Sequence, residues 1–538
     1  MKFLIFLLAP FLLFGKTITI DYLETLPNSR AKDFYVYLFL EQNISSNEAF
    51  KALKHANTFS PQIKKAWLKK IDDVEVKKEF ECFDLPTSKF ATADTKCVRI
   101  AMNYSNACNV NVKDIPVVIE KIGENSKYVP YMKVFQQKNP FEYLYSMNDD
   151  FFLSVFNNSG KYNRKTYFNQ VLPLDRVNSF VENSKFSTTA SILYSETNLD
   201  NFTNSIFDFN TTNINGEGAF SLGMLAITKN RDDLAFKCFT LSAKNSYKRR
   251  DKDKALFWSY LISRDVFFLE ELTKSYDINF YTMLAYELLE EFPTNIVSSV
   301  AHDENANRFL DPSDPFVWIK FTTALYEKSE DEQKEFILKH LTHIDNIPHL
   351  AYLLQKIEYK SKAYFVMPYD RYLNGIDDNR KALIYALGRQ ESYFIPTVVS
   401  TSYALGVMQI MPFLTKALAK ERGEETDYDE MFIPSKNLEY ANHYINYLEK
   451  QLIHPLFISY AYNGGITYLI NSFKKGLFHD KYRYDPFFTM ENISKLETRE
   501  YGKQVLANYA VYKRLLNEKV SMIELLKNLT PPFKKVEN

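Results

Sequence analysis

One glutamate stands where a carboxyl group could donate a proton to a substrate. Asp377 and Asp378 can cap a helix predicted over about 379–394, because aspartate accepts hydrogen bonds from the free N–H groups of a first turn. The apolar stripe of this helix runs through Leu383, Ile384, Leu387 and Phe394. Glu391 continues that stripe, so burial would raise its pKa and favour the protonated form that a general acid needs. The alternative is an exposed glutamate near the helix end, or one neutralised by Arg389.

Three further segments follow this glutamate over about 110 residues. They read STSYALGVMQIMP (400–412), AYNGG (461–465) and ETREY (497–501), after the pair Glu391-Ser392. In this order and spacing, the four segments resemble the catalytic domain of the soluble lytic transglycosylases, a lysozyme-like family that cleaves peptidoglycan. The resemblance covers roughly 362–516 directly and the upstream chain only in its helical, glycine-poor character.

The sequence departs from the family pattern at three places. Tyr403 and Ala404 stand where the family usually has Gly-Ala, and the Tyr403 ring either reshapes the substrate groove or points away from it. Val407 replaces the usual leucine, and Ile433 stands where an aspartate is common. None of these positions is the proposed acid.

The number of candidate carboxylates bears on how the glycosidic bond could be cleaved. Glycosidases usually use two carboxylates, and no second acid clearly pairs with Glu391, because Asp427 and Asp429 lie on a polar stretch that we expect to be solvated surface. A lone glutamate favours a substrate that supplies its own nucleophile. The resemblance implies non-hydrolytic, exolytic cleavage of the MurNAc-β-1,4-GlcNAc bond to 1,6-anhydroMurNAc, with Glu391 as acid and then base.

Six side chains are candidates for binding the substrate. Tyr462 and Asn463 can hydrogen-bond an acetamido group, and Ser400 can hydrogen-bond the carboxylate or the sugar. The other three are an amide for sugar hydroxyls, a flexible apolar wall and the family's acidic residue at the groove: Gln409, Met408 and Glu497. The alternative for the tyrosine and methionine side chains, including Met411, is a place in the core.

Glycine is rare in this chain and unevenly distributed along it. Only 14 of 538 residues are glycine, less than half of the roughly 7% average. Six lie in residues 1–374 and eight in the last 164, among them Gly406, Gly464 and Gly465 in the segments above. Sheets and hairpins consume glycine, so we predict an all-α fold, with a long α-superhelical scaffold of helical hairpins followed by a lysozyme-like catalytic domain.

The predicted domains are a signal peptide at 1–15, an α-superhelical domain at 16–285, a helical linker domain at 286–361 and a catalytic domain at 362–538. Amphipathic periodicity supports helices in the scaffold, for example over 31–42, 46–55, 61–71, 253–261, 280–291 and 332–341. Joints are expected at 203–218 and around 265–300.

The first residues look like an export signal. Lys2 precedes an uncharged apolar run of twelve residues that ends before Gly15, which is too short for a membrane span and typical of a signal peptide. No later stretch predicts a membrane span, so we expect a periplasmic protein. One disulfide among Cys82, Cys97 and Cys108 is plausible there, whereas Cys238 is expected to be a buried thiol.

The balance of charge excludes one class of partner. The chain carries 66 basic and 66 acidic residues, which argues against a nucleic-acid binder. His340, His343 and His349 match no metal-ligand pattern, and neither a metal nor an organic cofactor is expected. We expect a monomer whose partner is the peptidoglycan glycan strand, with other cell-wall enzymes as further candidates. Two rival readings remain: a hydrolytic muramidase of goose-lysozyme type, and a non-catalytic periplasmic glycan-binding scaffold.

Overall fold

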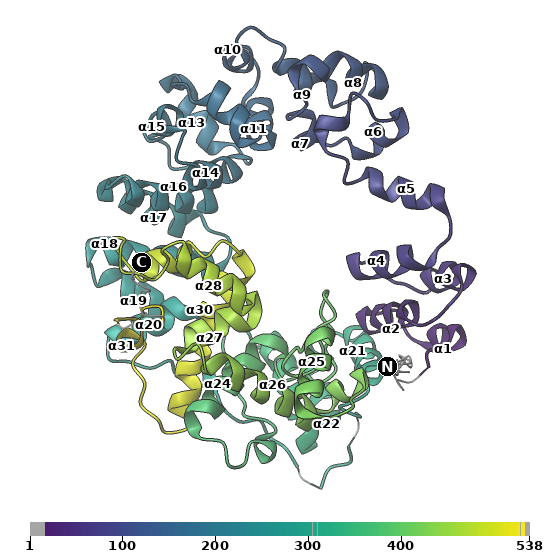
Figure 1. Ribbon diagram of the computed structural model, residues 1–538. Coiled ribbons are helices and arrows are strands. Elements are labelled where there is room, and N and C mark those ends of the chain that lie inside the picture. The colour runs from purple at the N-terminus through teal and green to yellow at the C-terminus, as the bar shows by residue number, and fades with distance from the viewer. Residues whose placement is uncertain (1–16, 304, 309, 528, 533–538) are drawn as a thin grey trace, which may run out of the picture. The chain divides into compact units, whose positions relative to one another are not determined.

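The protein is built almost entirely of short helices (Figure 1). The structure is a computed structural model that describes residues 17–303, 305–308, 310–527 and 529–532. The predicted signal peptide lies outside the described residues. The strands in the described ranges are β1 (Ile296–Val297) and β2 (Ala363–Tyr364), which pair in parallel. The all-α prediction is therefore confirmed.

The chain divides into two compact units, described separately below. The first unit comprises the residues up to Asp72, Thr294–Lys481 and those from Pro486 onward, and the second comprises Asp73–Pro293 and Tyr482–Asp485. The predicted boundaries at 285 and 361 stay predictions. The two compact units divide the chain differently, because residues 17–72 belong to the same unit as the candidate catalytic residues.

The helices of the first unit are α1 (Ile20–Thr25), α2 (Arg30–Glu41), α3 (Ser46–Leu53), α4 (Pro61–Lys70), α21 (Pro315–Tyr326), α22 (Glu330–His340), α23 (Ile347–Ile357), α24 (Asp378–Ser392), α25 (Pro412–Arg422), α26 (Pro434–Glu449), α27 (Pro455–Gly464), α28 (Ile466–Lys474), α29 (Phe487–Glu491), α30 (Leu496–Leu515) and α31 (Met522–Lys527), with 3₁₀ turns η4 (Ile344–Asn346), η5 (Asp370–Tyr372) and η6 (Tyr428–Phe432).

The helices of the second unit are α5 (Val74–Cys82), α6 (Thr95–Ala101), α7 (Tyr104–Ala107), α8 (Ile115–Ile122), α9 (Val129–Val134), α10 (Pro140–Tyr145), α11 (Asp149–Asn158), α12 (Lys161–Asn163), α13 (Leu174–Glu182), α14 (Phe186–Ser195), α15 (Asp200–Ile206), α16 (Gly216–Thr228), α17 (Asp232–Asn245), α18 (Arg249–Ser263), α19 (Phe267–Thr273) and α20 (Phe280–Leu288), with 3₁₀ turns η1 (Thr87–Lys89) and η2 (Val112–Asp114) and a π-helical turn η3 (Arg164–Phe168).

Side-chain caps begin many of these helices where the sequence places polar residues. Ser45 and Glu48 form a reciprocal capping box at α3, Ser60 accepts from the Ile63 N–H at α4, and Asp377 accepts from the Arg380 N–H at α24. Each cap satisfies an N–H group that the helix itself leaves free. All six of the example segments predicted from periodicity are helical, namely α2, α3, α4, α18, α20 and α22.

The second unit is a chain of helices in which neighbours pack in order. The helices α14, α16, α17, α18, α19 and α20 each pack on the next. The predicted joint at 203–218 is narrower than expected, because α15 continues to Ile206 and α16 begins at Gly216. Cys82 and Cys97 form the expected disulfide between α5 and α6, and Cys108 and Cys238 are buried thiols.

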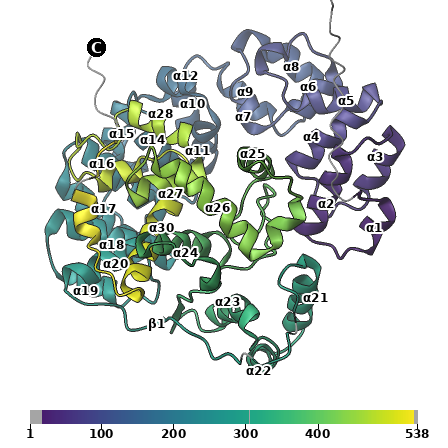
Figure 2. The same ribbon diagram turned by 60° about the horizontal axis from the view of Figure 1, so that its bottom comes forward.

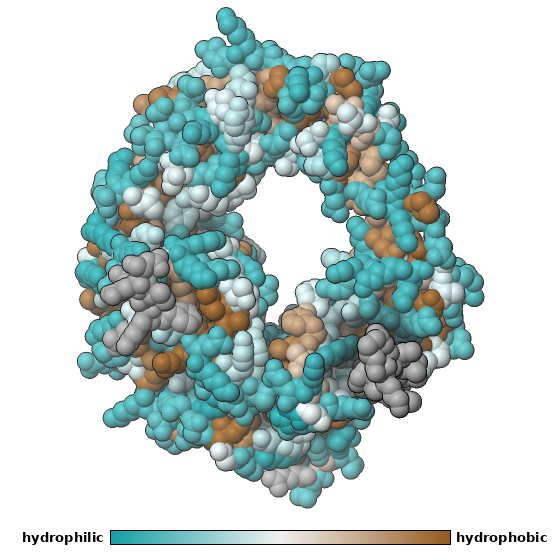
Figure 3. Space-filling view, viewed as in Figure 1, coloured by the Kyte–Doolittle hydropathy of each residue, from teal (hydrophilic) through white to brown (hydrophobic). Residues whose placement is uncertain are grey.

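The surface is mixed. In the face shown in Figure 3, hydrophobic residues form small separate patches among hydrophilic ones. No helix within the described ranges has the length and apolar character needed to cross a membrane.

Candidate active site

Three helices of the first unit position the candidate residues. Both α24 and α27 pack against α30, and the three lie together in Figure 2. Gly502 of α30 permits this close packing, since a Cβ atom there would lie 2.2 Å from Cε1 of Tyr460 on α27. Glu391 is on α24, Tyr462 and Asn463 are on α27, and Glu497 and Tyr501 are on α30.

The helix that carries Glu391 ends two residues earlier than predicted. Tyr393 and Phe394 have φ angles of 51° and 64°, in the left-handed region, so α24 stops at Ser392. Glu391 therefore lies in the last turn, where the partial negative charge of a helix C-terminus also disfavours a carboxylate. The Ser392 hydroxyl donates to the Val407 carbonyl at 2.7 Å, which ties this turn to the following loop.

Glu391 lies in surroundings that favour its protonated form. The residue is half-buried, and the protein around its carboxyl group raises its pKa from 4.5 to about 8, chiefly by desolvation. The neighbouring Glu497 carboxylate adds to this rise, whereas the Tyr501 hydroxyl, which donates to Oε1 at 2.6 Å, opposes it. No cation among the described residues lowers this pKa.

Arg389 does not neutralise Glu391. The two residues are separated by two positions and so point away from each other on the helix. The buried Arg389 guanidinium donates to the Tyr364 carbonyl at 3.0 Å and to Oδ1 of Asn508 at 3.1 Å. It also lies 3.8 Å from the centre of the Phe365 ring.

The segment Val399–Ile410 forms a compact loop beside α24. Leu405 makes antiparallel bridges with both Val399 and Ile410. The buried Asn437 amide closes the loop, because its Nδ2 donates to the Leu405 and Met431 carbonyls and its Oδ1 accepts from the Met408 N–H.

Gly406 lies at the crowded centre of this loop. Its φ angle is +80°, and a Cβ atom there would lie 2.1 Å from the Met431 carbonyl oxygen. Both the conformation and the close approach of backbone therefore exclude a side chain.

Tyr462 joins this loop to Glu391. Its hydroxyl donates to the Met408 carbonyl at 2.8 Å, and its pKa is raised well above 10 by burial and by the Glu391 charge. The Met408 side chain is fully buried. This methionine thus occupies the core position that the sequence left open as an alternative, and its carbonyl is what reaches Tyr462.

Asn463 and Glu497 are held next to each other. The Thr498 hydroxyl donates to Oδ1 of Asn463 at 2.7 Å, and Nδ2 of Asn463 lies 3.4 Å from Oε1 of Glu497. Glu497 itself is exposed. One N–H of the Asn463 amide remains for a ligand.

The side chains of Ser400 and Gln409 form hydrogen bonds with the backbone of the loop. The Ser400 oxygen accepts from the N–H groups of Ser402 and Ala404. Nε2 of Gln409 donates to the Val398 and Gly406 carbonyls at 3.0 and 2.8 Å. The side-chain carbonyl oxygen of Gln409 therefore remains to accept a hydrogen bond from a ligand. The sequence suggested that the amide could both donate to and accept from a sugar.

One expectation about neighbouring residues changes, and one open alternative is decided. Asp427 and Asp429 are half-buried rather than solvated, since Asp427 forms a capping box with Glu430 and Asp429 accepts from the Tyr35 hydroxyl at 2.6 Å. The Tyr403 side chain is 3% exposed and packs among α2–α4, so it points away from Glu391.

Sequence reasoning assigned no role to Tyr501 or to Asn437. The ETREY segment contained the first of these, and its final tyrosine was the signal that could have found it. Asn437 had no motif around it; only its complete burial, which is visible in the folded chain, identifies it.

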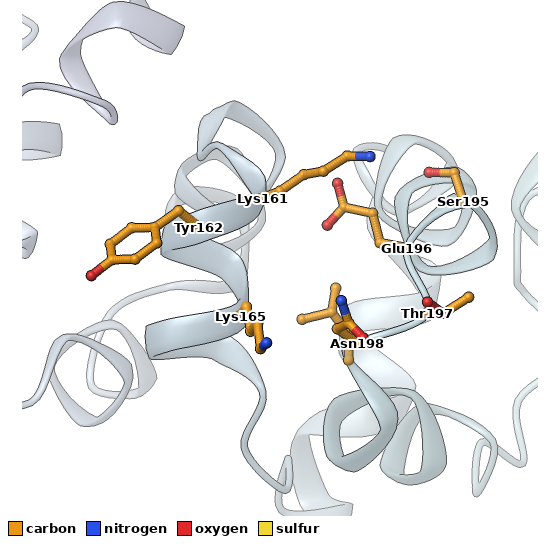
Figure 4. A pocket seen from close by; sticks show the side chains of 8 residues that line it. Lys161, Tyr162, Lys165, Ser195, Glu196, Thr197 and Asn198 are labelled. Carbon is orange, nitrogen blue, oxygen red and sulfur yellow. The ribbon is translucent and has the colours of Figure 1, made fainter. Parts of the chain in front are cut away.

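A separate recess of about 250 Å³ lies in the second unit (Figure 4). Its walls come from α12, η3 and the chain after α14: Lys161, Tyr162, Lys165, Ser195, Glu196, Thr197, Asn198 and Leu199. The Glu196 carboxylate pairs there with the buried Arg164 guanidinium, so it is not a free acid. This recess contains none of the candidate catalytic residues.

The described residues contain no group of three or more His, Cys, Asp or Glu side chains that could hold a metal ion. His349 is fully buried, and burial lowers its pKa to about 3, so it is neutral. Asp345 pairs with Arg371, and His343 caps η4.

Comparison with known proteins identifies the region around Glu391. Residues 374–484 match the family described as "Transglycosylase SLT domain". This segment is thus similar to that family. It contains Glu391, the loop at 399–410 and Tyr462, whereas Glu497 and Tyr501 follow it on α30.

Curated relatives align with less than a third of the chain. A soluble lytic murein transglycosylase of Salmonella typhimurium is 32% identical over 163 residues, and the protein of that name from Escherichia coli K12 is 30% identical over 162. Each alignment covers 29% of this chain and 24% of the relative. The chain thus spans about a quarter of the length of the curated relatives that it matches.

Solved structures resemble the whole chain at low identity. The lytic transglycosylase Slt of Pseudomonas aeruginosa, solved as an inactive mutant, has a TM-score of 0.48 at 15% identity and covers 94% of this chain and 85% of its own. A 70-kDa soluble lytic transglycosylase in complex with bulgecin A has a TM-score of 0.47 at 16% identity, with 94% and 84% covered.

Replacing Glu391 with glutamine should stabilise the protein at high pH. Because the folded-state pKa lies above the unfolded value, ionisation on raising the pH from about 4.5 to 8 favours unfolding. We expect Glu391→Gln and the unmodified chain to melt at similar temperatures at pH 5. The variant should melt several degrees higher at pH 9, since about 1 kcal/mol shifts Tm by roughly 2–4 °C for 150–250 residues. Calorimetry at the two pH values checks this, and an unchanged Tm difference would contradict it.

Alanine at Gly406 should destabilise the segment 374–484 more than alanine at Gly375. Both glycines have positive φ angles near +80°, but no atom lies within 4 Å of a Cβ placed at Gly375. The Gly375→Ala control therefore measures conformational strain alone, about 1–2 kcal/mol. Gly406→Ala adds the clash with the Met431 carbonyl, and urea unfolding should show a clearly larger loss. Equal losses would mean that the loop is not closed as described.

Proposed function

We propose that this protein is a peptidoglycan lytic transglycosylase that cleaves the MurNAc-β-1,4-GlcNAc bond. The observation that carries the proposal is the Glu391 carboxyl group, whose raised pKa keeps it protonated near neutral pH and whose Oε1 accepts a hydrogen bond from the Tyr501 hydroxyl. Its position within the segment 374–484, which matches the SLT domain family, supports the same substrate class. Peptidoglycan glycan strands are thus the proposed partner.

The first step breaks the glycosidic bond. The Glu391 acid donates its proton to the oxygen that joins C1 of MurNAc to O4 of GlcNAc, and the C1–O bond breaks as GlcNAc leaves with its hydroxyl restored. The 2-acetamido oxygen of MurNAc bonds to C1 and carries the positive charge as an oxazolinium. The Tyr501 hydroxyl, which donates to Oε1, then stabilises the carboxylate that Glu391 has become.

The second step closes the anhydro ring. The Glu391 carboxylate takes the proton of the MurNAc 6-hydroxyl, O6 bonds to C1, and the acetamido oxygen leaves C1 with its electron pair. The product is 1,6-anhydroMurNAc, no water is consumed, and Glu391 ends protonated. One residue with a raised pKa therefore suffices as acid and then base.

Neighbouring groups can bind the two sugars. The free N–H of Asn463 can donate to the acetamido oxygen, and the Gln409 carbonyl and the Ser400 hydroxyl can bind sugar hydroxyls. Glu497, exposed beside Asn463, can accept from a sugar hydroxyl or an amine of the peptide stem. We further propose exolytic action and a periplasmic location.

One observation favours a second candidate reaction. The Glu497 carboxylate is near enough to raise the pKa of Glu391. If it activated water, the protein would be a hydrolytic muramidase with two carboxylates. The exposure of Glu497 and its contact with Asn463 favour a binding role instead.

Mass spectrometry of digested sacculi tests the proposal. We expect products one water lighter than hydrolysed muropeptides. Glu391→Gln should reduce turnover by roughly 10²–10⁴-fold, the range of general acid–base catalysis, while glycan binding persists. Glu497→Gln is the matched control and should leave the anhydro product in place.

Three results would contradict this reading. Hydrated products that disappear in Glu497→Gln would establish the muramidase. If the unmodified chain bound glycan without cleaving it, the protein would be a non-catalytic glycan-binding scaffold. Unchanged turnover in Glu391→Gln would remove this residue from the mechanism.

A further inference from the structure

The Tyr403 side chain extends from the loop Val399–Ile410, called the catalytic loop below, toward helix α2 and the start of α4. Its ring is 3% exposed and lies 5.6 Å and 5.4 Å from the ring centres of Phe34 and Tyr37 on α2. Its hydroxyl is 2.7 Å from Oγ of Ser60, the residue that caps α4. The partners are thus more than 300 positions away in sequence but belong to the same compact unit.

The backbone at Tyr403 is in a conformation that a bulky residue rarely adopts. Its φ angle is 67°, in the left-handed region, at the end of the turn that begins with Ser400. A glycine would take this conformation without strain. A tyrosine persists there only if its side-chain contacts offset the strain, and the aromatic cluster and the Ser60 hydroxyl are those contacts.

The same helix α2 holds a second segment beside the loop. The Tyr35 hydroxyl donates to Oδ1 of Asp429 at 2.6 Å, and the Phe34 ring lies edge-on to Tyr428, 6.0 Å between centres. Asp429 and Tyr428 are both on η6, whose Met431 carbonyl shares the Asn437 amide with the loop. Helix α2 therefore contacts both segments that this asparagine joins.

The opposite end of the loop reaches the candidate catalytic residues. The Met408 carbonyl accepts from Tyr462, and the Val407 carbonyl accepts from Ser392, the neighbour of Glu391. Two bridges through Leu405 make the loop between Tyr403 and Met408 a short, cross-linked segment. A displacement at the Tyr403 end would therefore move the carbonyls that accept from Ser392 and Tyr462.

We propose that α2–α4 brace the catalytic loop and that Tyr403 is the positioning residue through which they do so. By anchoring the loop, Tyr403 keeps the Met408 carbonyl where it orients Tyr462 beside Glu391. The inference rests on the proposed glycan cleavage and adds a contribution from the N-terminal helices. The competing view is that Asn437 alone holds the loop, in which case Tyr403 only joins the helices to it.

Steady-state kinetics of the full chain on isolated glycan strands test the brace. Tyr403→Ala should lower kcat by roughly tenfold to a hundredfold, the cost of misplacing a catalytic group by about 1 Å, with KM within about threefold. The falling alkaline limb of kcat/KM, expected near pH 8 for the unmodified chain, should move to lower pH. A loosened loop admits water to Glu391, whose titratable neighbours are Tyr501, Tyr462 and Glu497.

Two variants separate positioning from loss of stability. Tyr403→Phe keeps the ring and loses only the hydroxyl, so it should restore most of kcat and the position of the alkaline limb. Phe50→Ala removes a ring that packs edge-on against Trp67 within α3 and α4, whereas the ring neighbours of Tyr403 are Phe34 and Tyr37 on α2. It should weaken the same helices without moving the limb.

The outcomes are distinct. If Phe50→Ala moves the limb as far as Tyr403→Ala, or if Tyr403→Ala moves neither kcat nor the limb, the brace is refuted while the proposed function stands. If the unmodified chain does not cleave glycan, both fall together. If Tyr403→Ala does not fold, Tyr403→Leu takes its place, since it removes the ring but keeps apolar volume: the brace predicts a lower kcat and a limb at lower pH, and a Tyr403→Leu variant that moves neither would overturn it.

Discussion

The constraint on which the site depends is a carboxyl group that is partly removed from water and has no cation beside it. An ionised carboxylate in such a place is costly, and the cost is relieved when the group keeps its proton. The Tyr501 hydroxyl is a suitable partner because it hydrogen-bonds Glu391 without supplying a positive charge. The nearest basic residue on α24, Arg389, is turned to Tyr364 and Asn508. An arginine directed at Glu391 would lower its pKa and remove the acid.

The packing of α24, α27 and α30 keeps Glu391 away from the Arg389 cation. Gly502 lets α27 approach α30, and Asn508 of α30 accepts from Arg389 and thereby fixes the direction of its guanidinium group. Tyr462 then brings the loop to Glu391 through the Met408 carbonyl. The buried amide of Asn437 gives the loop its closed shape. The hydrogen bonds made by Tyr501, Tyr462 and Asn437 thus come from neutral side chains, which leave the charge of Glu391 free to change during a reaction.

The sequence was sufficient to predict the helices and a glutamate whose burial raises its pKa; the role of Glu391 as the acid stays a prediction. Periodic apolar residues and caps such as Asp377 are local signals, and they placed α24 to within two residues at its end. That end was missed because Tyr393 and Phe394 take left-handed φ angles, which residue type does not predict for aromatic residues. The contacts of Tyr501, Asn437 and Tyr403 were not predictable, because each joins positions far apart in the chain. Asp429 looked like surface for the same reason, since its partner is Tyr35.

The most direct test of this account is the titration of the Glu391 carboxyl group itself. Infrared difference spectra of the unmodified chain against Glu391→Gln, or carboxyl carbon NMR with labelled glutamate, would follow this one group as the pH changes. The account predicts an apparent pKa of about 8 for Glu391. A value near 4.5 would show that the site holds a carboxylate at neutral pH, and the single-acid mechanism would be contradicted.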